Sequence, residues 1–174
     1  MNFQHSAIAV IEFSSITRGL LAVDVATKKA PVQVLWAEPV SHGKFVLLFS
    51  GGVAETQEAF AEASRLGGDK IIEEILIAQV VRSMGPIIGG ESKAISTTAS
   101  VGMLESSSIA AAVEAADLVL KTAPLVLNRF RLGNGIGGKS YFIFSGQLED
   151  VEAGLEVGIE KLESYGVLLG SELI

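Results

Sequence analysis

Apolar and polar residues along this chain form segments of two kinds, and the same series of segments occurs twice. Residues 7–13 are an almost wholly apolar run rich in β-branched residues, which predicts a buried strand. Residues 16–29 follow with apolar residues at helical spacing, and this predicted helix ends at Ala30-Pro31 because proline cannot continue a helix. A serine precedes the helix, where its hydroxyl can cap a free backbone N–H.

The predicted elements of both series follow one order, strand, helix, strand, strand, helix, strand. In the first series the strands are 7–13, 32–37, 45–50 and 70–78, and the helices are 16–29 and 53–66. In the second series the strands are 100–105, 125–132, 140–145 and 167–174, and the helices are 109–122 and 148–165. Residues 79–99, with Gly-Pro and Gly-Gly pairs, have the composition of a linker.

Sequence identities between the two series show that they are copies of one unit. Before a loop that is longer in the second copy, equivalent residues stand 93 positions apart, and after it they stand 95 apart. The matched residues include Ala22, Asp24 and Lys28 with Ala115, Asp117 and Lys121, and then Gly43, Lys44 and Phe49 with Gly138, Lys139 and Phe144. The sequence therefore predicts an α/β (α+β) chain of two tandem, ferredoxin-like β-α-β-β-α-β domains, at residues 1–90 and 91–174.

Composition narrows the classes of function. Hydrophobic residues make up 49% of the 174 residues, enough for a core with apolar surface left over for contact between subunits. The net charge of -7 does not suit nucleic-acid binding, and no apolar run is long enough to span a membrane. We find no signal peptide and expect a cytoplasmic protein. The chain has no cysteine, and His5 and His42 lack the spacing of a metal site, so we expect no metal.

Four duplicated carboxylates are the candidates for acid–base chemistry: Glu12, Glu105, Asp24 and Asp117. None has a histidine or nucleophile at a recognisable spacing. We expect structural hydrogen bonds or capping roles for them, no catalytic residue and no enzymatic activity.

Residues 101–105 and 109–121, a Gly-Met-Leu-Glu strand followed by an Ala-rich helix ending in lysine, resemble the bacterial microcompartment shell domain. Residues 9–12 and 16–28 are a looser match, and the resemblance covers almost the whole chain. With two copies fused, the chain is similar to the tandem-domain trimeric shell proteins. The resemblance implies a homotrimer that looks like a hexagon, tiles with other shell proteins around encapsulated enzymes, and passes small polar metabolites through a central pore.

The resemblance places the pore loops between the second and third strands of each copy, at residues 39–44 and 133–139. The residues that it implies line the pore are Ser41, His42, Gly43, Gly135, Ile136 and Gly137. Independently of the family, glycine permits positive φ and close backbone approach, which suits tight loops. The Gly-rich run is a poor phosphate-binding loop, because Lys139-Ser140 leads into a predicted strand and not into a helix.

Some trimeric relatives carry a cysteine in the first loop and hold an iron–sulfur cluster at the axis. Ser41 occupies the corresponding position here, and a neutral hydroxyl is a poor iron ligand, so we expect no cofactor. His42 has two interpretations, a group that makes the opening sensitive to pH or a solvated loop residue.

The resemblance also implies that Lys28 and Lys121 lie at the edges where tiles meet. The alternative interpretation is that each lysine stabilises a helix C-terminus through the helix dipole. Two other functions stay open, a tandem ferredoxin-like regulatory protein that binds a small molecule and, with less support, a small enzyme of the same fold.

Overall fold

The computed structural model describes residues 6–174, so His5 lies outside the described residues. The chain divides between Arg82 and Ser83 into two compact units, which we call the first and the second domain and describe separately. The first domain contains β1 (Ala7–Phe13), α1 (Ile16–Lys29), β2 (Gln33–Val40), β3 (Lys44–Gly51), α2 (Val53–Gly67) and β4 (Ile71–Ile77). The second contains α3 (Met84–Ile88), β5 (Ser100–Ser106), α4 (Ile109–Thr122), β6 (Val126–Arg131), β7 (Ser140–Gly146), α5 (Leu148–Ser164) and β8 (Leu168–Leu173).

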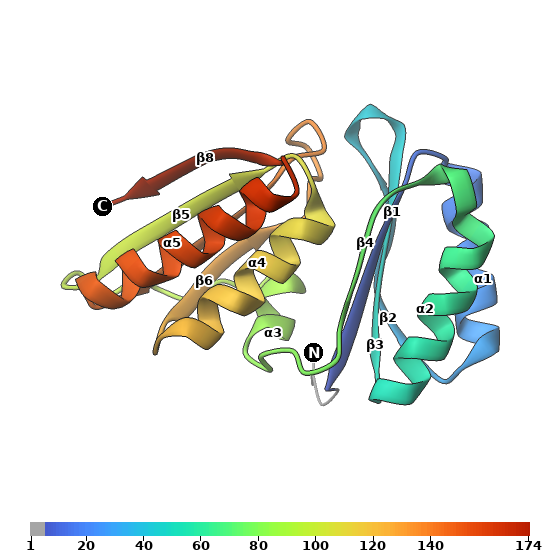
Figure 1. Ribbon diagram of the computed structural model, residues 1–174, viewed down its shortest axis with the longest axis horizontal. Helices are drawn as coiled ribbons and strands as arrows, with labels where there is room; N and C mark the ends of the chain where they lie inside the picture. Colours follow the sequence, from blue (N-terminus) through green and yellow to red (C-terminus); the bar gives the residue numbers. More distant parts are fainter. Residues whose placement is uncertain (1–5) are drawn as a thin grey trace. The chain divides into compact units, whose positions relative to one another are not determined.

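Each domain is built on one four-stranded antiparallel sheet. The strand order is β2-β3-β1-β4 in the first domain and β6-β7-β5-β8 in the second, with every neighbouring pair antiparallel. Helices α1 and α2 lie side by side against the first sheet, and α4 and α5 lie side by side against the second (Figure 1). The predicted fold class and the duplication are therefore confirmed.

Small residues on the helices and large ones on the strands build the core of the first domain. Phe13, Phe45 and Phe49 are fully buried on the sheet, and α1 and α2 present alanines to them. Alanine combines high helix propensity with a short side chain, so the helices approach the sheet closely. The face of the sheet that carries these phenylalanines is the one the helices cover.

The helix starts follow from the serines that the sequence places there. The Ser15 hydroxyl accepts a hydrogen bond from the Arg18 backbone N–H at 3.3 Å, and the Ser108 hydroxyl accepts one from the Ala111 N–H at 3.1 Å. Each bond satisfies a backbone donor that the helix itself leaves unpaired. The predicted caps are confirmed in both copies.

Two segments differ from the prediction. Residues 84–88, expected to belong to a linker, form the short helix α3, which contacts β6 and buries Met84 and Ile87. Pro86 lies in the first turn of α3, where a backbone N–H has no partner within the helix, so proline is tolerated there. Burial of the apolar residues therefore favours a helix although the Gly-Pro pair predicts a turn. Strand β2 continues through Pro39 to Val40, which is permitted because β2 lies at the edge of its sheet. No helix among the described residues is long and apolar enough to cross a membrane.

Candidate functional site

The loop between β2 and β3 is shorter than the sequence predicts. Because Pro39 belongs to β2 and Lys44 begins β3, the connection is a single 3-10 turn, Ser41–Gly43. His42 and Gly43 have φ of 66° and 75°, and His42 is the one non-glycine residue with positive φ in the described part of the chain. Both residues are exposed and Ser41 is half-buried, so the turn presents polar groups and backbone to solvent.

The loop between β6 and β7 is longer and depends on glycine. Four of its glycines have positive φ: Gly133, Gly135, Gly137 and Gly138. At Gly133 a β-carbon would also lie 2.8 Å from the Ile109 side chain, so this position admits no other residue without a shift. Gly135 and Gly137 are exposed, while Ile136 is half-buried. Lys139 leads into β7 and not into a helix, which agrees with the rejection of a phosphate-binding loop.

A lysine anchors the end of each loop to the first strand of its domain. Lys44 Nζ lies 3.3 Å from Glu12 Oε2, and Lys139 Nζ lies 2.8 Å from Glu105 Oε1. The sequence interpretation considered the two glutamates and missed their partners. The signal was present, since both the glutamates and the lysines are duplicated at the same offsets as the rest of the repeat.

The aspartates of the first helices pair with the lysines predicted at the tile edges. Lys28 Nζ donates to Asp24 Oδ2 at 2.8 Å on α1, and Lys121 Nζ donates to Asp117 Oδ2 on α4. In both pairs the lysine lies four residues, about one helical turn, after its aspartate. Lys28 is exposed on α1 and Lys121 is partly exposed on α4. Among the described residues, no group of three or more His, Asp or Glu side chains is arranged to hold a metal ion.

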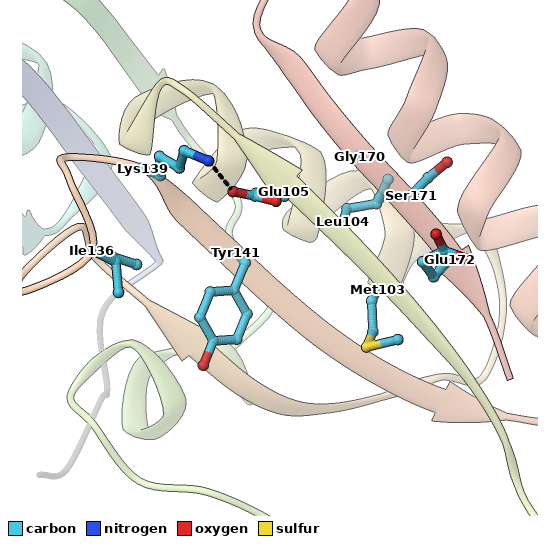
Figure 2. Close-up of a pocket in the computed structure, with 9 residues that line it drawn as sticks. All are labelled: Met103, Leu104, Glu105, Ile136, Lys139, Tyr141, Gly170, Ser171 and Glu172. Carbon is cyan, nitrogen blue, oxygen red and sulfur yellow. Dashed lines mark hydrogen bonds and ion pairs between the residues drawn. The ribbon is translucent and has the colours of Figure 1, made fainter.

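A groove of about 410 Å³ lies on the second domain, beside its glycine-rich loop (Figure 2). Met103, Glu105 and Tyr141 line it, and they alternate along their strands with Leu104 and Phe142, which are buried in the core. The groove therefore lies on the face of the sheet that the helices do not cover. Its lining residues are Met103, Leu104, Glu105, Ile136, Lys139, Tyr141, Gly170, Ser171 and Glu172.

The candidate pore residues thus fall on two loops, one in each domain. Ser41, His42 and Gly43 lie together in the first turn, and Gly135, Ile136 and Gly137 lie together in the second loop. Both loops connect the same pair of strands in the repeated topology, and both carry exposed backbone with positive φ. Such loops can contact small solutes through backbone groups that side chains do not shield.

Comparison with known proteins adds three findings. The family model described as the BMC domain matches residues 7–81 and again 100–174. The chain is 32% identical over 168 residues to the bacterial microcompartment shell protein PduT of Citrobacter freundii, covering 97% of this chain and 91% of that protein. It is also similar to the crystal structure of a microcompartments protein from Desulfitobacterium hafniense DCB, with a TM-score of 0.86, 29% identity, and 98% and 94% of the two chains covered.

A second solved structure shows the fold alone. A double-ringed trimeric shell protein of the RMM microcompartment matches with a TM-score of 0.70 at 17% identity, covering 91% of this chain and 83% of that one.

Proposed function

The chain belongs to the BMC-domain family of bacterial microcompartment shell proteins, and from that membership we propose that three copies form a pseudohexameric ring that tiles the shell and surrounds a central pore. The observation that carries this proposal is the presence of two BMC domains in one chain, each with the same sheet order. Two equivalent domains per chain give a ring of three chains a pseudo-sixfold outline. Its role is structural, not catalytic.

In this ring the turn Ser41–Gly43 and the loop around Ile136 line the pore. Their support is their shared place in the repeat and their exposed, positive-φ backbone. Pore diameter and the hydrogen-bonding groups along it set which solutes pass, and three copies of the Ser41 hydroxyl favour small polar metabolites. We propose no cofactor at this position.

The partners follow from the same proposal. The ring meets other shell proteins at its edges, where Lys28 and Lys121 lie, and the shell that it helps to build encloses enzymes in the cytoplasm. Lys28 supports an edge role because its side chain is exposed. Its ammonium group has three N–H donors, so it can bind Asp24 and also donate a hydrogen bond to a neighbouring shell protein.

Assembly is tested by native mass spectrometry of the purified full chain, followed by electron microscopy at higher concentration. We expect a homotrimer that grows into hexagonally tiled sheets. A monomer or dimer that never tiles would contradict the proposal and would favour the ligand-binding regulator, which predicts a discrete small oligomer and a saturable ligand.

The pore is tested by Ser41→Trp in intact shells, with solute entry followed by the rate at which an encapsulated enzyme consumes added substrate. We expect entry to slow several-fold, because three indole rings would narrow the constriction. Thr97→Trp, at an exposed position outside both loops, is the control for adding bulk and should leave entry unchanged. Equal rates for the Ser41 variant and the unsubstituted shell would remove Ser41 from the pore.

A further inference from the structure

A polar pocket lies at the β6 edge of the second sheet, where the segment between α3 and β5 passes beside that strand. Its volume is about 290 Å³, roughly ten times the volume of one water molecule in the liquid, so it suits a small metabolite. All of its lining residues belong to the second domain, so this domain forms the pocket by itself. They are Ser92, Lys93, Ile95, Asn128, Arg129 and Ile143.

The side chain of Asn128 has a fixed orientation in this pocket. Its Nδ2 donates to the backbone carbonyls of Lys93 and Ala94 at 3.4 and 3.3 Å, and the Lys93 N–H donates to the Asn128 carbonyl at 2.9 Å. Because only the nitrogen of the amide can donate to these carbonyls, Oδ1 must point away from them. Asn128 is 2% exposed, and within the described residues its Oδ1 accepts no hydrogen bond. A buried acceptor of this kind is unfavourable until a donor reaches it.

Two cationic side chains also line the pocket. Lys93 and Arg129 are both exposed, and in the part of the chain that the structure describes neither forms an ion pair. A guanidinium offers parallel N–H donors that match two oxygens of a phosphate, and an ammonium adds a second positive charge. In a chain with a net charge of -7, the pocket is thus a local site for an anion.

The first domain has apolar residues at the positions of two of these polar groups. Both copies interrupt the strand register at the same place, so that Leu35 of β2 corresponds to Asn128 of β6. The residue after the interruption pairs with the third strand, and it is Trp36 in the first domain and Arg129 in the second. The shared fold therefore does not require the amide or the guanidinium, which indicates a separate role for them in the second domain.

From these groups we propose that the pocket binds a small phosphate monoester that also carries a hydroxyl group. A phosphate monoester has about 1.5 to 2 negative charges at pH 7, which match the two cations Lys93 and Arg129 better than the single charge of a carboxylate does. The ligand hydroxyl donates to Asn128 Oδ1 and satisfies it. This binding site goes beyond the proposed function and does not rest on it.

Isothermal titration calorimetry of the full chain with glycerol 3-phosphate tests the ligand class, because this probe carries both chemical groups. Inorganic phosphate has the anion alone, glycerol has the hydroxyls alone, and D-glycerate has a carboxylate in place of the phosphate. We expect saturable binding of glycerol 3-phosphate, about 10-fold tighter than that of each other probe. Tighter binding of D-glycerate would overturn the phosphate assignment. Equally tight binding of inorganic phosphate would overturn the hydroxyl contact and leave an adventitious anion site only.

Substitutions in the full chain test the location of the site. Arg129→Gln should weaken binding of glycerol 3-phosphate by about 10-fold or more, because charge-assisted hydrogen bonds are lost. Lys93→Gln should weaken it by about 3- to 10-fold, because an exposed ammonium is partly screened by water. Arg131→Gln is the matched control, since it removes the same charge from an exposed arginine of β6 outside the pocket lining, and it should change the affinity by less than about 2-fold.

Two outcomes would overturn the inference as a whole. One is the absence of saturable binding by the unsubstituted chain at millimolar probe, and the other is an equal loss in Arg129→Gln and Arg131→Gln. Asn128 is kept in every variant because its amide also holds the segment before β5. Circular dichroism shows whether each variant is folded, and native mass spectrometry shows whether it keeps the oligomeric state of the unsubstituted chain. Failure of the pocket is thereby told apart from failure of the proposed ring.

Discussion

The two domains carry the same two ion pairs but bury opposite ones. The first pair joins the first strand of each domain to the lysine that follows its loop. Its carboxylate is fully buried in the first domain, where it belongs to Glu12, and the equivalent Glu105 of the second domain is 42% exposed. The pair on the first helix is reversed, since Asp117 is buried in the second domain and Asp24 is exposed in the first. The two copies keep the same charged residues, but the difference in burial changes how much each ion pair contributes to the stability of its domain.

Burial decides what such a pair contributes. An exposed pair contributes little because water and salt screen it, while removal of one partner from a buried pair leaves a charge that water cannot reach. The two domains therefore have distinct weak points despite their shared topology. In the first domain, loss of the lysine of the Glu12–Lys44 pair should lower stability most, and in the second domain, loss of the lysine of the Asp117–Lys121 pair should.

Among substitutions at the ion pairs, the largest effect should come from Lys44→Met. Methionine keeps much of the lysine stem but removes the positive charge beside the buried Glu12 carboxylate. We expect the free energy of unfolding to fall by about 2 to 4 kcal/mol, less than for a wholly buried pair because Lys44 keeps some contact with water. Chemical denaturation followed by circular dichroism measures the change.

The matched control is Lys28→Met, which breaks an exposed pair on α1. We expect a loss of about 0 to 0.5 kcal/mol, typical of helix pairs at i and i+4. Equal losses in the two variants would contradict the link between burial and the weight of these pairs.

Much of the fold follows from local sequence signals. The bounds of β1, α1 and α4 match the prediction because a serine cap and an Ala-Pro stop define the helices, and an uninterrupted apolar run defines the strand. The short turn at His42 was not predicted. Its left-handed backbone is rare for a residue other than glycine, and it is required here because β2 runs to Val40 and β3 begins at Lys44, which leaves three residues to reverse the chain. The groove beside Tyr141 was missed for a related reason, since alternation shows that a strand has two faces but not what covers each one.

The helix–sheet contact also differs between the domains, and Gly19 shows how. A β-carbon at Gly19 would lie 2.2 Å from Cδ1 of Phe45, so the glycine lets α1 pass over a large ring on β3. In the second domain the equivalent positions hold Ala112 and Ser140. The smaller strand residue leaves room for the methyl group on the helix, so the second domain pairs two small residues where the first pairs a glycine with a phenylalanine.

The close approach of Gly19 to Phe45 predicts that Gly19→Ala has a smaller effect on stability, and that this effect depends on the residue at position 45. Alanine favours a helix over glycine by about 1 kcal/mol, but the clash with Phe45 should outweigh this gain and lower the free energy of unfolding by about 1 to 3 kcal/mol. In a Phe45→Ala background the ring is absent, so the same substitution should become neutral or stabilising, although that background is itself less stable by about 3 to 5 kcal/mol. The four proteins form a double-mutant cycle measured by chemical denaturation. The same loss from Gly19→Ala in both backgrounds would show that the Phe45 ring is not its cause and that the two positions are not energetically coupled.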